Sequence, residues 1–251
     1  MPYALRTRFK KEIVAEFLPP VRAGKRQRVV IICDGAPTVP ARSSLVQFFS
    51  KKGFWAIYPR YRGTWESDGV FLRRSPEQDV LDVIDSLPRG FKDLWSGKTY
   101  RVQPDEVFIV ATSFGGPAGI LASRDPRVSK VVAVSPVVDW QAPSKAEPIN
   151  AAGFRLIHET FGNGYRFGLS EWKKLAGGKF YNPVRHAAEI DGAKLLIFHA
   201  RDDQSVRWNE VARFACATGA TLKLFKKGGH LSGRRIVPGH WNRIAKFLKK
   251  S

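Results

Sequence analysis

Short apolar runs alternate with amphipathic stretches along most of this chain of 251 residues. The apolar runs show no helical spacing, which is typical of strands that are buried on both faces of a parallel sheet. Strands are predicted at residues 28–33, 55–58, 107–111, 130–134, 194–199 and 221–225. Strands that alternate with helices in this way predict an α/β fold with a mostly parallel, doubly wound sheet.

Helices are predicted in segments between and after these strands, where apolar residues recur at helical spacing. They cover residues 43–52, 75–87, 117–122, 208–218 and 241–249. Near the amino terminus, residues 12–18 alternate loosely between apolar and polar side chains and predict an edge strand.

The composition is that of a globular protein, since 43% of the residues are hydrophobic and 12% are aromatic. A chain of this length can bury a full core as one unit, so residues 1–251 are expected to form a single domain. No apolar run approaches the roughly 20 residues that span a bilayer, and the first residues lack the apolar core of a signal peptide. Two cysteines, Cys33 and Cys216, imply no disulfide framework. A reduced, cytoplasmic protein is expected.

The charge balance is strongly basic. The 42 Lys and Arg residues outnumber the 22 Asp and Glu residues, which gives a net charge of +20, and no acidic residue follows Glu210. Such a field attracts nucleic acid, anionic lipid or acidic substrates. Because no nucleic-acid-binding signature accompanies the charge, we interpret it as a solvated basic surface and predict no specific nucleic-acid partner.

One serine lies where a predicted strand turns sharply into a predicted helix. Residues 107–111 are apolar, and Thr-Ser-Phe-Gly-Gly follows them at 112–116. The small residues Ala111 and Gly115 let the chain pass closely on either side of the turn, so Ser113 is exposed at the carboxyl end of the sheet. This is the geometry of a nucleophile elbow, with alanine in place of the usual first glycine. Taken alone, Ser113 is equally well explained as a loop or helix-cap serine.

A serine hydroxyl is a poor nucleophile until a base accepts its proton, and the base needs an acid that fixes its tautomer. The chain has five histidines, at positions 158, 186, 199, 230 and 240. Of these, His230 lies in a glycine-flanked loop directly after the last predicted strand. That loop is at the carboxyl-end rim of the sheet, where Ser113 also points. We therefore predict that His230 is the base.

The acid is expected on the loop after the preceding strand. That loop reads His-Ala-Arg-Asp-Asp-Gln-Ser-Val over residues 199–206. Position alone allows either Asp202 or Asp203. Both choices give the chain order Ser…Asp…His, which is one of the orders known for this chemistry.

These motifs resemble the α/β-hydrolase superfamily and, within it, the catalytic domain of the prolyl oligopeptidase group and related small esterases. The pattern His-Gly-x-x-Asp-x-x-Val aligns on residues 199–206 and selects Asp203 as the acid. The pattern Arg-Gly-x-x-x-Ser-x-Gly aligns on residues 62–69, and Tyr-Asn-Pro at 181–183 is also similar. The resemblance covers residues 28–250 and implies the α/β-hydrolase fold.

The same resemblance implies an oxyanion hole made of two backbone N–H groups. One belongs to Phe114, directly after the serine, and the other to the loop at residues 34–37, with Ala36 as the donor. Each such donor is typically worth about 10²–10³ in rate. A plain turn is the alternative interpretation of this loop. Asp34 departs from the family pattern, because a carboxylate that faced the oxyanion would oppose catalysis, so it must turn away or find a partner.

Residues 137–186, here called the insertion segment, interrupt the alternation between two predicted strands. The segment carries many aromatic side chains: Trp140, Phe154, Phe161, Tyr165, Phe167, Trp172 and Tyr181. Ordinary packing onto the sheet explains them. The interpretation that we favour is a small helical cap that covers the active site and supplies an apolar acyl pocket.

Together these observations predict a serine carboxylesterase that acts on a small ester substrate through Ser113, His230 and Asp203. No metal or organic cofactor is expected, because no metal-ligand spacing is present. A peptidase or a lactonase with the same residues is the alternative enzyme, and feruloyl-type specificity is a narrower variant. A basic binding protein on the same fold, without catalysis, is the alternative from another class. Oligomeric state is not indicated.

Overall fold

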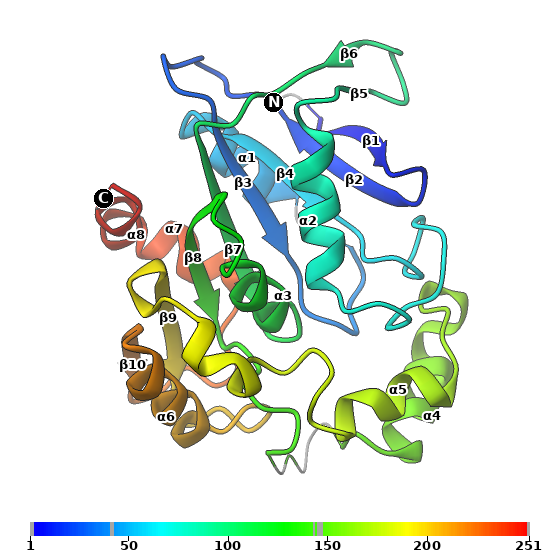
Figure 1. Ribbon diagram of the computed structural model, residues 1–251, viewed down its shortest axis with the longest axis vertical. Coiled ribbons are helices and arrows are strands. Elements are labelled where there is room, and N and C mark those ends of the chain that lie inside the picture. The colour runs from blue at the N-terminus through cyan, green and yellow to red at the C-terminus, as the bar shows by residue number, and fades with distance from the viewer. Residues whose placement is uncertain (1–2, 41–42, 143, 145–147, 250–251) are drawn as a thin grey trace.

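The computed structural model describes residues 3–40, 43–142, 144 and 148–249. Within them, an eight-stranded sheet has the strand order β1-β2-β4-β3-β7-β8-β9-β10 (Figure 1). The strands are β1 Leu5–Phe9, β2 Ile13–Leu18, β3 Arg28–Cys33, β4 Trp55–Pro59, β7 Glu106–Thr112, β8 Val128–Val134, β9 Leu195–Ala200 and β10 Thr221–Phe225. The six strands from β4 to β10 in this order run parallel. At the other edge, β2 pairs antiparallel with β4 and β1 pairs antiparallel with β2.

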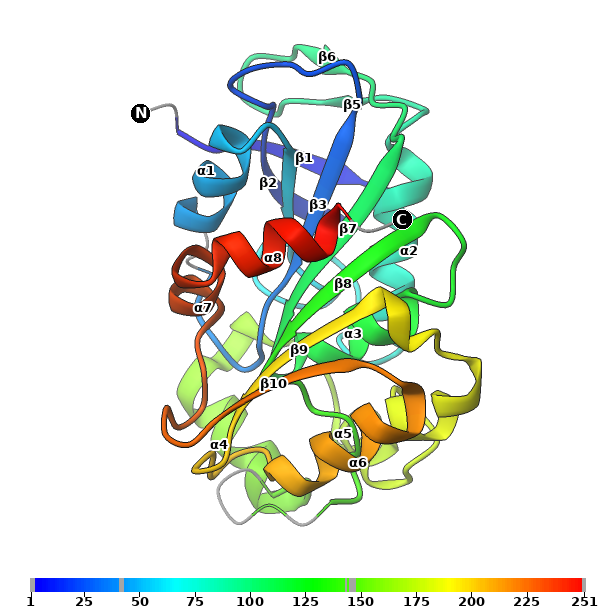
Figure 2. The ribbon, with the colours of Figure 1, turned by 90° about the vertical axis from the view of Figure 1, so that its left-hand side faces the viewer.

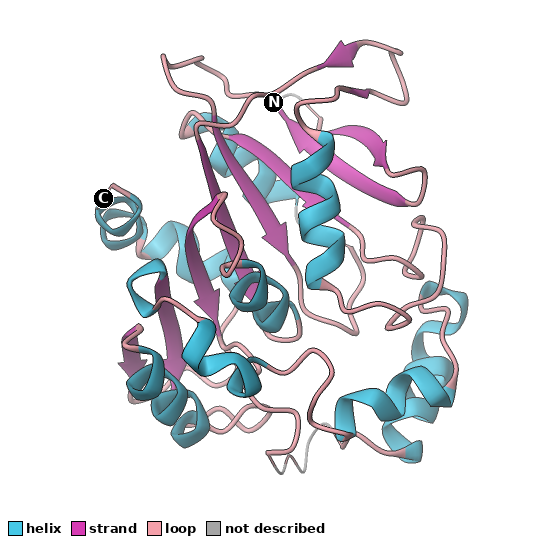
Figure 3. Cartoon of the chain, in the orientation of Figure 1, coloured by secondary structure: helices cyan, strands magenta, loops and turns pink. Residues whose placement is uncertain are grey.

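Helices cover both faces of the sheet, as the secondary-structure colouring of Figure 3 shows. One face packs against α1 Ser43–Lys51, α7 Gly233–Gly239 and α8 Trp241–Leu248 (Figure 2). The other face packs against α2 Glu77–Ser86, α3 Gly115–Ala122 and α6 Trp208–Thr218. Successive residues of β3 point to opposite faces, so Ile31 joins one apolar cluster and Ile32 the other. The predicted doubly wound α/β fold is confirmed.

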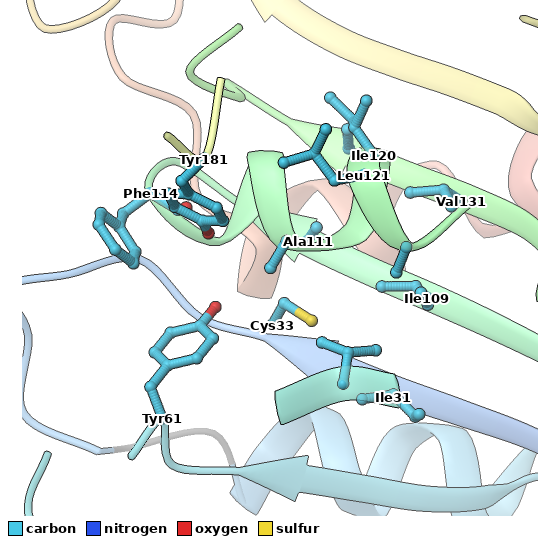
Figure 4. Packing of buried hydrophobic residues seen from close by; sticks show 14 of the residues in the cluster. Ile31, Cys33, Tyr61, Ile109, Ala111, Phe114, Ile120, Leu121, Val131 and Tyr181 are labelled. Atoms are coloured by element: carbon cyan, nitrogen blue, oxygen red, sulfur yellow. The ribbon is translucent and has the colours of Figure 1, made fainter. Parts of the chain in front are cut away.

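The core beneath α3 is tightly packed. Figure 4 shows the side chains of Ile109, Ala111, Ile120 and Val131 between this helix and the sheet. A Cβ atom added at Gly119 would lie 2.9 Å from the Ala111 Cβ, closer than real Cβ contacts come. Glycine at this position therefore allows α3 to lie directly on β7, which fixes the start of the helix relative to the end of the strand.

The insertion segment contains α4 Ala151–Phe161, the 3₁₀ turn η1 Gly162–Gly164 and α5 Leu169–Ala176, and η2 Pro183–Glu189 begins within it. Its residues 143 and 145–147 lie outside the described residues. The Asn150 side chain accepts hydrogen bonds from the N–H groups of Ala152 and Gly153, which caps the start of α4. Helices α4 and α5 lie side by side beyond the end of the sheet in Figure 1.

The structure differs from the sequence-based expectation at three places. The strand expected at the edge, β2, is not the edge strand, because β1 pairs with its outer side. Strand β1 reads Leu-Arg-Thr-Arg-Phe, and its short polar pattern gives little strand signal. Helix α7 reads Gly-Arg-Arg-Ile-Val-Pro-Gly, a composition typical of a loop, and forms against the sheet through the buried Ile236 and Val237. A two-stranded sheet of β5 Phe91–Lys92 and β6 Thr99–Tyr100 was also not expected.

Two further features bear on the expectations from sequence. Within the described residues, Cys33 is buried, Cys216 is exposed and both are free thiols. No helix in that part of the chain is long and apolar enough to cross a membrane. The short 3₁₀ turn η3 Gly192–Lys194 leads into β9.

Candidate active site

Ser113 follows β7 directly and has a φ angle of +53°, in the left-handed region that is costly for a residue with a side chain. Hydrogen bonds of the Ser113 backbone N–H and carbonyl to other residues stabilise this conformation. The Ser113 N–H donates to the Val134 carbonyl at 3.0 Å, and its carbonyl accepts from the N–H of Gly116 at 2.8 Å and of Val137 at 3.2 Å. The end of β8, the residues after it and the first turn of α3 therefore determine together where the Ser113 hydroxyl lies.

Two glycines let the loop after β3 approach the serine. A Cβ atom at Gly115 would lie 2.4 Å from the Asp34 carbonyl oxygen, so only glycine fits there. A Cβ atom at Gly35 would lie 3.3 Å from the Ser113 Cβ and 3.8 Å from its Oγ. The loop that follows β3 therefore runs directly alongside Ser113, which places the Ala36 segment beside the serine.

Asp203 is buried in the loop after β9. Its Oδ1 atom accepts hydrogen bonds from the N–H groups of Ser205 at 2.9 Å and Val206 at 3.0 Å. Its Oδ2 atom lies 2.9 Å from the Nδ1 atom of His230. Burial acts to raise the pKa of Asp203, but the hydrogen bonds from His230 and Val206 outweigh it, so the pKa lies below its usual value. The carboxylate therefore stays charged near neutral pH.

The neighbouring Asp202 has a different task. Its carboxylate accepts hydrogen bonds from the N–H groups of Gly228 at 3.2 Å and Gly229 at 2.9 Å. Gly229 has a φ angle of +58°, and Gly228 one of +155°. Asp202 thus shapes the glycine turn that presents His230, while Asp203 contacts the imidazole itself. Position alone had left the two aspartates equivalent and the family pattern had selected Asp203, which is the aspartate that contacts His230 in the structure.

The loop that carries His230 crosses the carboxyl ends of β7 and β8. The N–H of Leu231 donates to the Ser135 hydroxyl at 3.0 Å, and Ser135 follows β8 directly. A Cβ atom at Gly233 would lie 2.7 Å from the Thr112 Oγ1, and Thr112 precedes Ser113. These contacts bring His230 to the edge of the sheet where Ser113 lies. The His230 side chain retains 31% of its surface exposure, so the imidazole is accessible.

The other four histidines have partners of their own. His199 is fully buried, lies 3.6 Å from Asp203 and has its Nε2 atom 3.0 Å from the Val206 carbonyl. Burial lowers its pKa, so it stays neutral and donates to that carbonyl. His158 contacts the Phe154 and Phe167 rings, His186 bonds with Arg124 and Glu189, and His240 packs on Phe198 and Phe225.

The Asp34 carboxylate has hydrogen-bond partners in its own loop and in β4. Its Oδ1 accepts a hydrogen bond from the Gly35 N–H at 2.8 Å, and its Oδ2 accepts from the Tyr58 hydroxyl at 2.8 Å. The Asp34 carbonyl accepts from the Tyr61 hydroxyl at 3.1 Å. Because the Gly35 N–H is used in this way, the next amide along the loop, that of Ala36, is the candidate for binding an oxyanion.

Aromatic side chains gather around the start of α3. Figure 4 shows Phe114, Tyr181 and Tyr61 together there. The Phe114 ring centroid lies 5.1 Å from that of Tyr181, 5.3 Å from Phe71 and 5.6 Å from Trp140. The Tyr181 hydroxyl donates to the Phe114 carbonyl at 2.6 Å, which ties the insertion segment to the residue after the serine.

The sequence analysis considered Asp202 only as an alternative acid and did not single out Ser135. For Ser135 a signal was present, because this hydroxyl residue directly follows β8, as Ser113 directly follows the neighbouring strand β7. For Asp202 the signal was obscured, since its partners are the backbone N–H groups of a glycine turn 26 and 27 residues away. No cluster of three or more His, Cys, Asp or Glu side chains that could hold a metal ion occurs among the described residues.

The sequence matches the model of the prolyl oligopeptidase family over residues 40–251. No curated protein matches the chain in sequence. Among solved structures, an esterase of Pyrococcus furiosus is similar with 17% identity and a TM-score of 0.65, over 99% of this chain and 90% of its own. Est1E of Butyrivibrio proteoclasticus has 13% identity and a TM-score of 0.69, over 99% of this chain and 100% of its own.

A longer protein shares the same fold. The acylaminoacyl peptidase of Pyrococcus horikoshii is 18% identical with a TM-score of 0.65, and the similarity covers 99% of this chain but 41% of the peptidase. At such identities these likenesses concern the fold, and the α/β-hydrolase fold expected from the sequence is confirmed. The family match extends over most of the chain, including Ser113, Asp203 and His230. The chain belongs to the prolyl oligopeptidase family and is a serine hydrolase.

Proposed function

We propose that this hydrolase is a carboxylesterase that cleaves short-chain acyl esters through an acyl-enzyme intermediate on Ser113. The observation that carries the proposal is the hydrogen bond between Asp203 and His230 on a loop that lies beside the strained Ser113. Because the charged Asp203 accepts from Nδ1, the proton of the neutral imidazole resides on that nitrogen. The Nε2 atom is then the acceptor for the serine proton.

The reaction proceeds in two halves with the same three side chains. The Ser113 Oγ atom attacks the acyl carbonyl carbon while His230 takes its proton, and the resulting oxyanion binds the N–H groups of Phe114 and Ala36. The ester C–O bond then breaks, and His230 returns the proton to the departing alcohol. Water attacks the acyl-enzyme with His230 again as the base, which releases the carboxylic acid and restores the Ser113 hydroxyl.

Two features support the oxyanion assignment. Phe114 lies directly before α3, so its N–H belongs to the positive end of a helix. Asp34 is hydrogen-bonded to Tyr58 and the Gly35 N–H, so its charge is held away from the position that the oxyanion would occupy. The aromatic side chains Trp140 and Tyr181 favour an apolar acyl group, and we propose that the insertion segment acts as a cap over it.

The substrate class is tested with p-nitrophenyl acetate, butyrate and octanoate, and with an amino-acid p-nitroanilide as the amide substrate. Wild-type protein is compared with Ser113→Ala and with Ser44→Ala, which changes an exposed serine in α1. We expect ester turnover that is lost in Ser113→Ala and retained in Ser44→Ala, because loss of one member of a catalytic triad removes most of the rate enhancement of all three. Faster turnover of the amide would make the protein a peptidase, in line with its similarity to acylaminoacyl peptidase. Equal turnover by wild type and Ser113→Ala would exclude Ser113 as the nucleophile.

A further inference from the structure

The loop that carries Ala36 is held at Thr38 by two side chains from other parts of the chain. The Tyr165 hydroxyl accepts a hydrogen bond from the Thr38 N–H at 2.8 Å and donates one to the Thr38 carbonyl at 3.1 Å. The indole Nε1 of Trp65 donates to the same carbonyl at 2.9 Å. Both backbone polar groups of Thr38 are therefore paired by side chains, as buried backbone groups are where no strand or helix partner is present.

Tyr165 belongs to the insertion segment, and the surrounding backbone fastens it to the loop between β4 and α2. The Trp65 N–H donates to the Gly164 carbonyl at 2.8 Å, and the Arg166 N–H donates to the Gly63 carbonyl at 2.7 Å. These two bonds flank an antiparallel bridge between Thr64 and Tyr165. The position of the Tyr165 hydroxyl thus depends on the docking of the insertion segment.

The same loop is held at its other end by the core of the protein. Asp34 is bonded to the hydroxyls of Tyr58 and Tyr61, and Gly35 packs against Ser113. Ala36 therefore lies between one attachment on the sheet side, at residues 34 and 35, and a second attachment on the insertion side, at Thr38. Without the second attachment, the next fixed element after Ala36 is α1, which begins only at Ser43.

We propose that Tyr165 is a positioning residue that holds the Ala36 N–H at the place where the oxyanion forms, so that docking of the insertion segment completes the catalytic site. This inference rests on the proposed function, in which Ala36 supplies an oxyanion donor. The Tyr165 hydroxyl contacts the backbone of Thr38, two residues beyond Ala36. Tyr165 therefore acts through the loop and does not need to touch the reacting atoms.

The chemistry of Tyr165 suits this task. The side chain is 3% exposed, and burial raises its pKa to about 12, so the hydroxyl keeps the proton that it donates to Thr38. Its ring packs against Trp65, Phe71 and Phe161, with centroids 6.2, 5.4 and 5.7 Å away. Replacement by phenylalanine therefore keeps the packing and removes the two hydrogen bonds to the loop.

The kinetic test compares Tyr165→Phe with Tyr100→Phe in p-nitrophenyl ester hydrolysis. Tyr100 lies in β6, packs among Phe17, Trp55 and Phe91, and its hydroxyl has no hydrogen-bond partner among the described residues. We expect Tyr165→Phe to lower kcat about 10- to 100-fold with KM within about threefold, because an oxyanion donor acts in the transition state and a 1 Å misplacement costs about 10². Tyr100→Phe should match wild type.

Two further variants complete the kinetic experiment. Trp65→Phe removes one of the two donors to the Thr38 carbonyl and should lower kcat less than Tyr165→Phe does. Its control is Trp55→Phe, which makes the same change in β4, where the indole packs edge-on against the Tyr100 ring. Ser113→Ala is assayed alongside, so that failure of the proposed function is recognised separately.

The second readout does not depend on turnover. Hydrogen–deuterium exchange of peptides that span residues 34–40 reports whether Thr38 is held, because its amide loses its partner in Tyr165→Phe. We expect exchange in this segment to accelerate about tenfold or more in Tyr165→Phe and to remain unchanged in Tyr100→Phe. Exchange in the strands of the sheet should be the same in both variants.

The outcomes separate the two claims. A Tyr165→Phe protein with kcat within twofold of wild type, or with unchanged exchange at 34–40, overturns the positioning role. A parallel loss of kcat and of melting temperature, with faster exchange throughout the insertion segment, also overturns it, since Tyr165 would then act on stability alone. Turnover that persists in Ser113→Ala refutes the proposed function, while the exchange measurement still decides whether Tyr165 holds the loop.

Discussion

The backbone N–H of Leu231 donates to the hydroxyl of Ser135 at 3.0 Å, and this bond joins the loop of His230 to the end of β8. Both groups are buried, and Ser135 itself has a φ angle of +44°. The bond crosses 96 residues of sequence. It places the loop that follows β10 over the end of β8, which is the strand beside β7 and Ser113.

Ser135→Ala should lower kcat about tenfold and destabilise the protein by about 1–3 kcal/mol, because the Leu231 N–H is left buried without a partner. The control is Ser129→Ala. The Ser129 hydroxyl also accepts from a backbone N–H, that of Val107 at 3.3 Å, but at the far end of β8. Kinetics and urea unfolding of both variants check the prediction, which fails if Ser129→Ala impairs turnover as much as Ser135→Ala does.

The two adjacent aspartates should differ sharply. Asp203→Asn should reduce kcat by about 10⁴, because an amide opposite Nδ1 favours the wrong tautomer of His230. Asp202→Ala removes the bonds to Gly228 and Gly229 and should cost about tenfold at most, since it alters only the turn. Steady-state kinetics of the two variants measure the difference. A larger loss in Asp202→Ala would make that residue the acid.

The glycines beside the serine should separate stability from activity. Gly115→Ala forces a Cβ against the Asp34 carbonyl oxygen and should destabilise the protein by about 1–3 kcal/mol. Gly35→Ala meets Ser113 at 3.3 Å, so a displacement of a few tenths of an ångström suffices, and kcat should fall about tenfold with a small change in melting temperature. Gly239→Ala, which faces open space, is the control. A Gly35→Ala protein with wild-type kcat would contradict the close approach.

His199 should make stability depend on pH. Burial lowers its pKa below the ordinary 6.5, so the unfolded chain binds more protons than the folded one when the pH falls through 6.5. The stability contributed by the neutral form is therefore present above pH 6.5 and lost below it, with a slope of at most about 1.4 kcal/mol per pH unit. The free energy of unfolding of wild type should fall more between pH 7 and pH 5 than that of His199→Gln. Parallel curves for the two proteins would contradict this.

The elements that sequence predicted well are those whose signal is local. Strand β7, the turn at Ser113 and helix α3 follow from an apolar run, a cluster of small residues and a second apolar stretch within 16 residues. Helix α6 is found over Trp208–Thr218, the same range as expected from its apolar spacing. The placement of β2 at the edge was wrong because its neighbour β1 carries two arginines in five residues and is defined by its pairing rather than by its own pattern.

The sequence alone determined the α/β fold, the serine at the end of a buried strand and the loops on which a histidine and two aspartates lie. These features depend on residue spacing, which is read along the chain. Tertiary structure decided that Asp202 binds the glycine turn before His230, that Tyr58 binds the Asp34 carboxylate and that Tyr165 of the insertion segment reaches Thr38 across 127 residues. Such contacts form only when packing brings distant segments together, because a hydrogen bond extends about 3 Å and leaves no periodic trace in the sequence.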